Sequence, residues 1–298
     1  MSIEDQIPRD VFEAISALAY QQAGIVIGPQ RKALVAARIG KRLRILGFSQ
    51  YRQYLNYLES AIGQGSAGKK VYEQELVALL DVMTTNFTHF WREPKHFEIL
   101  LEDVRTRIKK GQKEFTIWCA AASTGEEPYT LAMIALEALR LENQSLSTIK
   151  VRILATDLST KVLETCRVGY YSMKSMKDLA PEWLGRYWNF ADGEIPFRTT
   201  HHKGPETLLS ANETLRSVLK FARMNLMQTP YAMKGPFDVI FCRNVMIYFD
   251  QVGRKTVVDE AKRLLAPGGL FCIGHSESLM GLQDGFSLVI SACYKRIK

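Results

Sequence analysis

The sequence predicts an α/β protein in which a doubly wound parallel sheet carries a small antiparallel β insertion and follows an all-helical N-terminal domain. Three observations lead to this prediction. In the first 80 residues, apolar side chains recur at helical spacing. From residue 115 onward, short apolar runs alternate with amphipathic stretches, as in a parallel sheet covered by helices. One stretch, residues 186–221, breaks this alternation with short β-leaning pieces between Gly, Pro and polar residues.

The composition is that of an ordinary globular protein with an excess of positive charge. The 298 residues suffice for about two domains, and 47% of them are hydrophobic. Because 39 Lys and Arg residues stand against 31 Asp and Glu residues, we expect an acidic partner: nucleic acid, an anionic membrane surface or an acidic protein. No apolar run approaches the roughly 20 residues of a membrane span, and the first residues lack a signal-peptide layout. Five scattered cysteines without a CxxC pair predict buried free thiols in a cytoplasmic protein.

The N-terminal domain, residues 1–80, contains one strongly basic helix. Apolar Val35, Ile39 and Leu43 recur at helical spacing, and Gly47 stands where the helix would end. No acidic residue interrupts its positive charges, which are Arg31, Lys32, Arg38, Lys41, Arg42 and Arg44. The arginines at 31, 38 and 42 fall on one face of the helix. This face is either a solvated surface or a docking surface for an acidic partner.

The rest of the chain divides into a linker, residues 81–95, and a second domain, residues 96–298. A flexible loop is expected at Gly63–Gly68, followed by a helix from about Tyr72. Strands are predicted at Phe115–Cys119, Val151–Ala155, Val218–Ala222, Phe237–Cys242, Leu270–Gly274 and Phe286–Tyr294. Helices are predicted at Glu126–Glu142, Ser159–Arg167 and Gln251–Leu265. The β-leaning pieces of the insertion are Tyr187–Phe190, Ile195–Thr199 and Thr207–Leu209.

The predicted strand Phe115–Cys119 runs through small residues into the start of a helix. Such a junction is where an α/β fold approaches a nucleotide, because small side chains let the ligand lie against the backbone. The GxGxxG and GK[ST] patterns are absent, and the carboxylates of Glu126 and Glu127 at the helix start would repel phosphate. These observations argue against NAD and ATP as ligands. They favour a nucleoside without phosphates, and such nucleosides include positively charged ones.

Polar residues also follow two further strands. Asp157 ends the second strand, where an acid usually binds ribose hydroxyls; the alternative is that it caps the next helix. Arg243 and Asn244 follow the fourth strand, and the segment Pro267–Gly269 turns a helix into a strand. The order of these features predicts a methyltransferase that uses S-adenosylmethionine.

Four long motifs narrow this prediction further. They are Thr84–Glu93 (TTNFTHFWRE), Ala122–Tyr129 (ASTGEEPY), Cys242–Asp250 (CRNVMIYFD) and Gly274–Ser278 (GHSES). With them the chain resembles the chemotaxis-receptor glutamate methyltransferases, the CheR family, from the basic helix almost to the C-terminus. The resemblance implies a Rossmann-like domain that transfers the methyl group of S-adenosylmethionine to glutamate carboxylates of chemoreceptors and leaves S-adenosylhomocysteine.

The resemblance also implies roles for individual residues. The cofactor-binding positions would be Asn86, Thr88, Arg92, Glu126, Asp157, Asn225, Leu226, Arg243 and Asn244. Of these, Glu126 and Asp157 would hold the amino-acid end and the ribose, while residues 225 and 226 would flank the adenine. Arg92 and Tyr248 would be the catalytic positions beside the methyl group. The basic helix would dock on the receptor through Arg38, Lys41, Arg42 and Arg44.

The family resemblance implies a partner, but the β insertion of this chain departs from the family pattern. It implies a monomer that binds the cytoplasmic helical methylation region of chemoreceptors and is recruited to membrane receptor arrays without entering the bilayer. The insertion is longer than in members that bind a receptor tail peptide, and His201–Lys203 makes it more polar, so no tail-peptide contacts are carried over. The five histidines show no metal-ligand spacing, and no metal is expected.

The predicted reaction requires the protein to position the acceptor carboxylate rather than to supply a general acid or base. A glutamate with a pKa of about 4.3 is already ionised near neutral pH, so no general base is needed. The Tyr248 hydroxyl and the Arg92 cation would orient the carboxylate.

Two other interpretations of the function stay open. One is a nucleic-acid methyltransferase, which the lack of aromatic residues among the basic ones disfavours. The other is a regulatory protein that binds the cofactor without catalysis, which the presence of Arg92 and Tyr248 disfavours.

Overall fold

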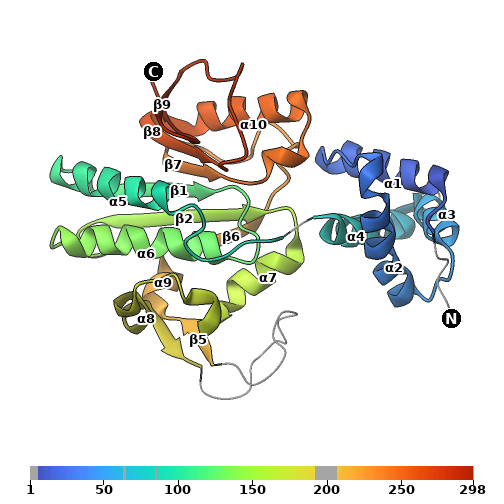
Figure 1. The fold of residues 1–298 in the computed structure, drawn as a ribbon, viewed down its shortest axis with the longest axis horizontal. Helices are drawn as coiled ribbons and strands as arrows, with labels where there is room; N and C mark the ends of the chain where they lie inside the picture. The colour runs from blue at the N-terminus through green and yellow to red at the C-terminus, as the bar shows by residue number, and fades with distance from the viewer. Residues whose placement is uncertain (1–5, 63–64, 85, 192–206, 298) are drawn as a thin grey trace.

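A bundle of helices lies beside a seven-stranded sheet that is covered on both faces (Figure 1). The computed structural model describes residues 6–62, 65–84, 86–191 and 207–297. The expected strand Ile195–Thr199, the polar segment His201–Lys203 and Thr85 of the first motif lie outside the described residues. No helix within these described ranges is both long enough and apolar enough to cross a membrane.

The N-terminal bundle is all-helical, as predicted. Its elements are α1 (Arg9–Ala23), a short 3-10 turn η1 (Pro29–Arg31), α2 (Lys32–Leu46), α3 (Tyr51–Ile62) and α4 (Gly65–Met83). Helix α2 buries the apolar face that the spacing predicted, and it ends at Gly47, whose φ of 72° suits a residue without a side chain. Because α4 already begins at Gly65, the expected loop at Gly63–Gly68 is mostly wrong.

The main sheet has the strand order β6-β2-β1-β7-β8-β10-β9. Its strands are β1 (Glu114–Cys119), β2 (Lys150–Asp157), β6 (Leu219–Arg223), β7 (Phe237–Cys242), β8 (Leu265–Ile273), β9 (Phe286–Ile290) and β10 (Cys293–Arg296). The first five pair in parallel, and β10 pairs antiparallel with both β8 and β9. The predicted single strand Phe286–Tyr294 is therefore wrong in one respect. A turn through Ala292, with a φ of 60°, divides it into two antiparallel strands.

Helices cover both faces of this sheet because its strand residues are apolar on both sides. On one face lie α5 (Pro94–Lys109) and α6 (Glu126–Leu141), which pack side by side (Figure 1). Along β7, Val239 and Phe241 join the core under these helices, while Ile240 joins the core on the face that α10 (Gln251–Leu264) covers. Helix α7 (Thr160–Val168) follows β2. The predicted doubly wound α/β fold is confirmed.

The insertion forms a separate three-stranded antiparallel sheet. Its strand order is β3 (Tyr170–Ser172), β5 (Leu208–Ala211) and β4 (Trp188–Phe190), accompanied by η2 (Met173–Met176), α8 (Pro181–Tyr187) and α9 (Glu213–Ser217). The elements differ from the expected span 186–221 at both ends. Strand β3 lies before that span, and residues 219–221 belong to β6 of the main sheet. Strand β3 was not predicted from the sequence.

Two contacts connect the N-terminal bundle to the domain that contains the main sheet. Residues Ala19, Ala23 and Leu80 of the bundle form a small core that packs against Leu158, directly after β2. The Tyr20 hydroxyl donates a hydrogen bond to Asp250 at 2.7 Å, so the bundle also touches the start of α10. All five cysteines are buried free thiols, as expected.

Candidate functional site

The candidate active site is a cavity with an empty volume of about 920 Å³ at the carboxyl ends of β1, β2 and β7. The N-terminal bundle and the linker complete its walls. Open parallel sheets bind small ligands at this edge. Nine predicted residues line it: Asn86, Thr88, Arg92, Asp157, Asn225, Leu226, Arg243, Asn244 and Tyr248. Segments that are far apart in the chain are thus brought together as the sequence analysis expected.

One predicted cofactor residue, Glu126, does not line the cavity, whereas its neighbour Glu127 does. The Glu126 carboxylate accepts a hydrogen bond from the Thr124 hydroxyl at 2.6 Å, and burial raises its pKa. Glu127 instead faces Arg243 at 2.8 Å and accepts a hydrogen bond from the Cys119 thiol. Adjacent helical residues point about 100° apart, so the sequence could not decide which glutamate faces the ligand.

The turn between β1 and α6 is tightly constrained. Gly125 has a φ of 105°, and a Cβ atom there would lie 2.2 Å from the Tyr171 hydroxyl, so only glycine fits. Ser123 also has a left-handed backbone, with a φ of 48°. Its N–H donates to Asp157 at 2.8 Å, and its hydroxyl donates to the carbonyl of Asn86 at 3.1 Å. These bonds tie the turn to β2 and to the linker across the cavity.

Asp157 stands at the end of β2 with both carboxylate oxygens toward backbone donors. They accept hydrogen bonds from the N–H groups of Ser123 at 2.8 Å and Ser159 at 2.9 Å. The cap of α7 is Ser159, whose hydroxyl accepts from Val162, so the alternative interpretation of Asp157 as a helix cap is wrong. Burial raises the pKa of Asp157 despite these bonds. The carboxylate is therefore a fixed acceptor on the cavity wall.

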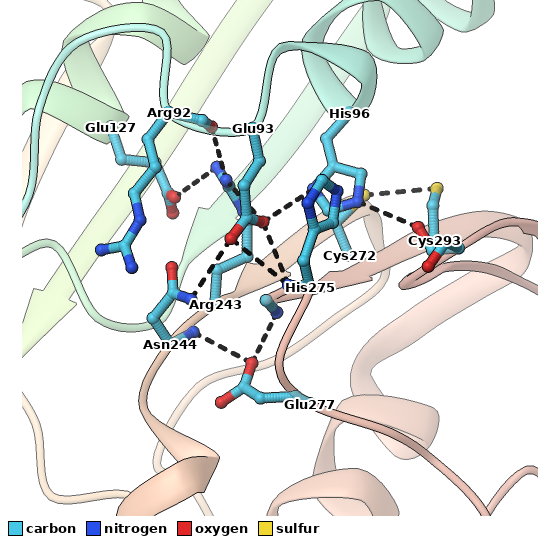
Figure 2. A network of polar contacts seen from close by, with 12 residues as sticks. Arg92, Glu93, His96, Glu127, Arg243, Asn244, Cys272, His275, Glu277 and Cys293 are labelled. Carbon is cyan, nitrogen blue, oxygen red and sulfur yellow. Dashed lines mark hydrogen bonds and ion pairs between the residues drawn. The ribbon is translucent and has the colours of Figure 1, made fainter.

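Arg243 is the buried cation of the site. Its guanidinium contacts Glu127 at 2.8 Å and Glu93 at 2.9 Å, and it also donates to the carbonyl of Arg92 (Figure 2). Burial alone would lower the pKa of Arg243, but the two carboxylates outweigh burial and raise it. One cation thus faces two carboxylates at the cavity.

Asn225 and Leu226, which follow β6, connect the sheet to the N-terminal bundle. The Asn225 amide donates to the carbonyl of Gln22 at 2.6 Å and accepts from the N–H of Met227 at 3.0 Å. The carbonyl of the buried Leu226 accepts a hydrogen bond from the Tyr231 hydroxyl at 2.9 Å. The end of helix α1 is therefore part of the cavity wall, a contact that sequence patterns do not reveal.

Tyr248 lies at the end of the short turn η3 (Met246–Tyr248), where the N-terminal bundle also meets it. Its carbonyl accepts a hydrogen bond from the N–H of Val26 at 2.9 Å. The guanidinium carbon of Arg31 lies 5.6 Å from the centroid of its ring, within cation–π range. The sequence analysis placed Arg31 in a basic stripe but did not connect it with Tyr248.

The predicted docking residues fall into two groups. Lys41 and Arg44 are exposed on α2. Arg42 pairs with the buried Glu75 of α4, and Arg38 donates to the carbonyl of Met83. Half of the expected docking set is therefore engaged inside the bundle, because the face that carries these arginines packs against α4.

Three potential metal ligands come together although their sequence spacing did not suggest it. One ligand atom each of Glu93, His96 and His275 lie within 4.8 Å of one another. The Glu93 oxygens already accept from Arg243, from Asn244 and from the N–H of His275. The neighbouring guanidinium charge would also repel a divalent cation. The cluster therefore fits a hydrogen-bond network better than a metal centre.

Fold and cavity together define a class of protein, the Rossmann-like methyltransferases that use S-adenosylmethionine. Two family models match the chain: "CheR methyltransferase, all-alpha domain" over residues 10–84 and "CheR methyltransferase, SAM binding domain" over residues 86–294. The chain belongs to the CheR family of chemotaxis protein methyltransferases, and it is an enzyme that uses S-adenosylmethionine as its methyl donor.

Curated relatives match over nearly their whole length. The chemotaxis protein methyltransferase of Escherichia coli (strain K12) is 39% identical over 93% of this chain and 87% of its own. The one of Borreliella burgdorferi is 31% identical over 97% of this chain and 95% of its own. Among solved structures, the N-methyltransferase NodS from Bradyrhizobium japonicum is 13% identical, with a TM-score of 0.35 over 70% of this chain and 100% of its own. So low a score carries no argument.

Proposed function

We propose that the enzyme transfers the methyl group of S-adenosylmethionine to glutamate side chains of chemoreceptors, which become methyl esters. The observation that carries this proposal is the cavity in which Glu127, Asp157 and Arg243 lie at the sheet edge, with Tyr248 and Arg92 on the same walls. The printed names of the curated relatives, chemotaxis protein methyltransferases, support a chemosensory substrate.

The cavity fits the cofactor chemically. Negative charge from Glu127 and Asp157 suits the ammonium group, the ribose hydroxyls and the sulfonium of S-adenosylmethionine. We assign the ribose to Asp157, the adenine to Asn225 and Leu226, and the methyl end to Arg92 and Tyr248. Glu127 takes the role that the sequence analysis gave to Glu126. The remaining cavity positions, Asn86, Thr88, Arg243 and Asn244, complete the proposed cofactor site.

The protein would act by holding the acceptor carboxylate in line with the methyl group. When bound, the cofactor supplies a methyl group on a positively charged sulfur that a carboxylate oxygen can displace. A glutamate side chain is ionised near neutral pH, so no residue has to remove a proton. The Tyr248 hydroxyl and the Arg92 guanidinium would orient the carboxylate, and holding two reactants in position contributes about 7–11 kcal/mol in well-aligned cases.

The proposed partner is the helical, acidic methylation region of a chemoreceptor in the cytoplasm. Exposed Lys41 and Arg44 would dock on it, and Arg38 and Arg42 would support helix α2 from within the bundle. We propose a monomer recruited to receptor arrays, in which residues 1–80 dock, the linker 81–95 completes the cofactor site and residues 96–298 carry out the transfer. We expect no nucleic acid and no metal to take part.

A label-release experiment tests the proposal. Receptor-containing membranes are incubated with the protein and methyl-labelled S-adenosylmethionine and are then treated with mild alkali. Volatile methanol is expected, because a carboxyl methyl ester is hydrolysed by alkali. Alkali-stable label would point to methylation of nitrogen or of a nucleic-acid base, and no label would point to a protein that binds the cofactor without catalysis.

Replacing Tyr248 by Phe tests its positioning role. The change removes the hydroxyl but keeps the ring that lies beside Arg31. We expect turnover to fall about tenfold, the equivalent of one lost hydrogen bond in the transition state, with little change in S-adenosylhomocysteine affinity. Methanol release measures the first quantity and calorimetric titration the second. Unchanged turnover would remove Tyr248 from the mechanism.

A further inference from the structure

Glu93 connects three segments of the chain outside the cavity itself. It lies directly before α5, and its carboxylate contacts Arg243 at 2.9 Å. The same carboxylate accepts from the side-chain amide of Asn244 and from the N–H of His275, each at 3.3 Å (Figure 2). Glu93 does not line the cavity, whereas Arg92, Arg243 and Asn244 all do. Any influence of Glu93 on the ligand therefore passes through these neighbours.

The segments that Glu93 joins hold backbone conformations that side-chain-bearing residues rarely adopt. Trp91 has a φ of 61°, Glu93 a φ of 58° and Asn244 a φ of 58°. Such a backbone conformation is energetically unfavourable and persists only where the surrounding contacts hold it. Two of them flank Arg92 in the linker, and the third follows Arg243. The strained residues therefore lie on both sides of the contact between the Glu93 carboxylate and Arg243.

Further contacts fix the positions of Arg243 and Asn244 relative to the linker. The Arg243 guanidinium donates to the carbonyl of Arg92 as well as to the Glu93 carboxylate. On the other side, the Glu277 carboxylate accepts from the N–H of Asn244 at 2.9 Å. A Cβ atom at Gly274 would lie 2.4 Å from the Asn244 amide nitrogen, so the loop after β8 approaches that residue as closely as a backbone can. Asn244 is thus held from two directions.

The charge of Glu93 persists in its buried setting. Burial would raise its pKa, but the Arg243 charge and the hydrogen bonds to the carboxylate outweigh burial and lower it. The buried His96 lies on the other side, with Nδ1 3.6 Å from the carboxylate and no hydrogen-bond partner for that atom. Glu93 therefore remains a charged partner of Arg243, which it shares with Glu127.

From this geometry we propose that Glu93 is a positioning residue, which closes the linker onto the methyltransferase sheet and so sets Arg92 and Asn244 toward the methyl end of the cofactor. The inference rests on the proposed function for its reaction but not for its cofactor. Glu93 acts through Arg243 and Asn244 and touches neither substrate nor cofactor.

Glu93→Gln tests the inference, with Glu98→Gln as the matched control. Glu98 lies on α5, which begins directly after Glu93, and pairs with Lys95 in an exposed ion pair. In Glu93→Gln, Arg243 keeps Glu127 at 2.8 Å, so no buried cation loses all its partners and the fold should survive. We expect the dissociation constant for S-adenosylhomocysteine to rise about tenfold in Glu93→Gln and to stay within about twofold of wild type in Glu98→Gln.

Kinetics separate positioning from general destabilisation. At saturating cofactor, Glu93→Gln should lower kcat about tenfold while the KM for receptor stays within about twofold, because the docking helix α2 is remote from Glu93. A variant that was merely less stable would lose active enzyme without raising the dissociation constant of its folded fraction. Wild-type cofactor affinity or wild-type kcat in folded Glu93→Gln would overturn the inference.

A second variant decides the matter if Glu93→Gln does not fold. Glu93→Asp keeps the charge beside Arg243 but withdraws the carboxylate by one methylene, so the fold should be retained and cofactor affinity should fall severalfold. Unchanged affinity in Glu93→Asp would overturn the inference. Because S-adenosylhomocysteine binding needs no acceptor, failure of the wild-type methanol assay would reject the proposed function and leave the role of Glu93 to be decided by binding.

Discussion

One buried arginine–glutamate cluster lies in the N-terminal bundle, and another lies at the cavity. In the bundle, Arg42 is 19% exposed and pairs with Glu75, which is 4% exposed. The Glu75 carboxylate also accepts a hydrogen bond from Tyr54 at 2.8 Å. At the cavity, the fully buried Arg243 side chain faces two carboxylates, Glu93 and Glu127.

The two clusters use the same contact for different purposes. The bundle cluster balances one cation with one carboxylate and does not line the candidate active site. The cavity cluster gives one cation two carboxylates, and of these two Glu127 lines the cavity. Buried ion pairs contribute little net stability once desolvation is counted, but they are costly to break. The comparison teaches that the charge balance of a cluster, more than its burial, separates a structural pair from a functional one.

The largest effect is expected for Arg243→Gln, which breaks the functional cluster. The change leaves Glu93 and Glu127 without their cation, and removing one partner of a buried pair costs about 3–5 kcal/mol. We expect the free energy of unfolding to fall by about that amount and S-adenosylhomocysteine binding to be lost. Urea denaturation and calorimetry measure the two. Arg152→Gln, which breaks an exposed pair with Glu114, should cost about 1 kcal/mol or less.

The structural cluster should respond differently. Glu75→Gln leaves Arg42 and Tyr54 with a neutral partner, and we expect the free energy of unfolding to fall by about 1–3 kcal/mol. Because the bundle cluster lines no part of the cavity, S-adenosylhomocysteine affinity should not change. Denaturant titration and calorimetry again provide the measurements. A loss of cofactor affinity comparable with that of Arg243→Gln would contradict the division into two kinds of cluster.

Lowering the pH should reduce the free energy of unfolding through His96, which packs beside Glu93. Burial, together with the nearby Arg243 charge, lowers the pKa of His96 from 6.5 to about 4. In the unfolded chain the imidazole gains its proton near pH 6.5, whereas in the fold it stays neutral until about pH 4. The unfolded state therefore binds more protons in this window, and the free energy of unfolding should fall as the pH falls through it. Denaturation at several pH values should show a smaller slope in His96→Asn.

The smallest effect is expected at the exposed positions of α2. Replacing Lys41 and Arg44 by Glu should raise the KM for receptor about fivefold, since each exposed charge contributes only about 0.2–1 kcal/mol. S-adenosylhomocysteine affinity should stay the same, and the effect should shrink at high salt. Arg42→Glu is not a clean test of docking, because it would place two carboxylates together at Glu75. Receptor methylation that is insensitive to the double exchange would leave the charge of α2 as a solvated face.

Much of the site could be predicted because its residues occur in long contiguous motifs. Arg92, Arg243, Asn244 and Tyr248 line the cavity as expected. Such motifs place polar residues at strand ends and turns, where the chain direction alone brings them to one edge of the sheet. The structure places Glu127 rather than the predicted Glu126 at the cavity, because the orientation of the first helical turn depends on the tight backbone at residues 123–125.

By itself, the sequence determined the layered α/β fold, the helical bundle and the motifs at the ligand edge. These depend on local periodicity and on turn residues such as Gly47, which short stretches of chain contain. Only the tertiary structure decided that Arg31 meets Tyr248, that Arg42 is engaged by Glu75 and that Glu93 joins Arg243. Each of these contacts joins residues that are distant in sequence. Their partners depend on how whole elements pack, and no periodicity in the chain records that packing.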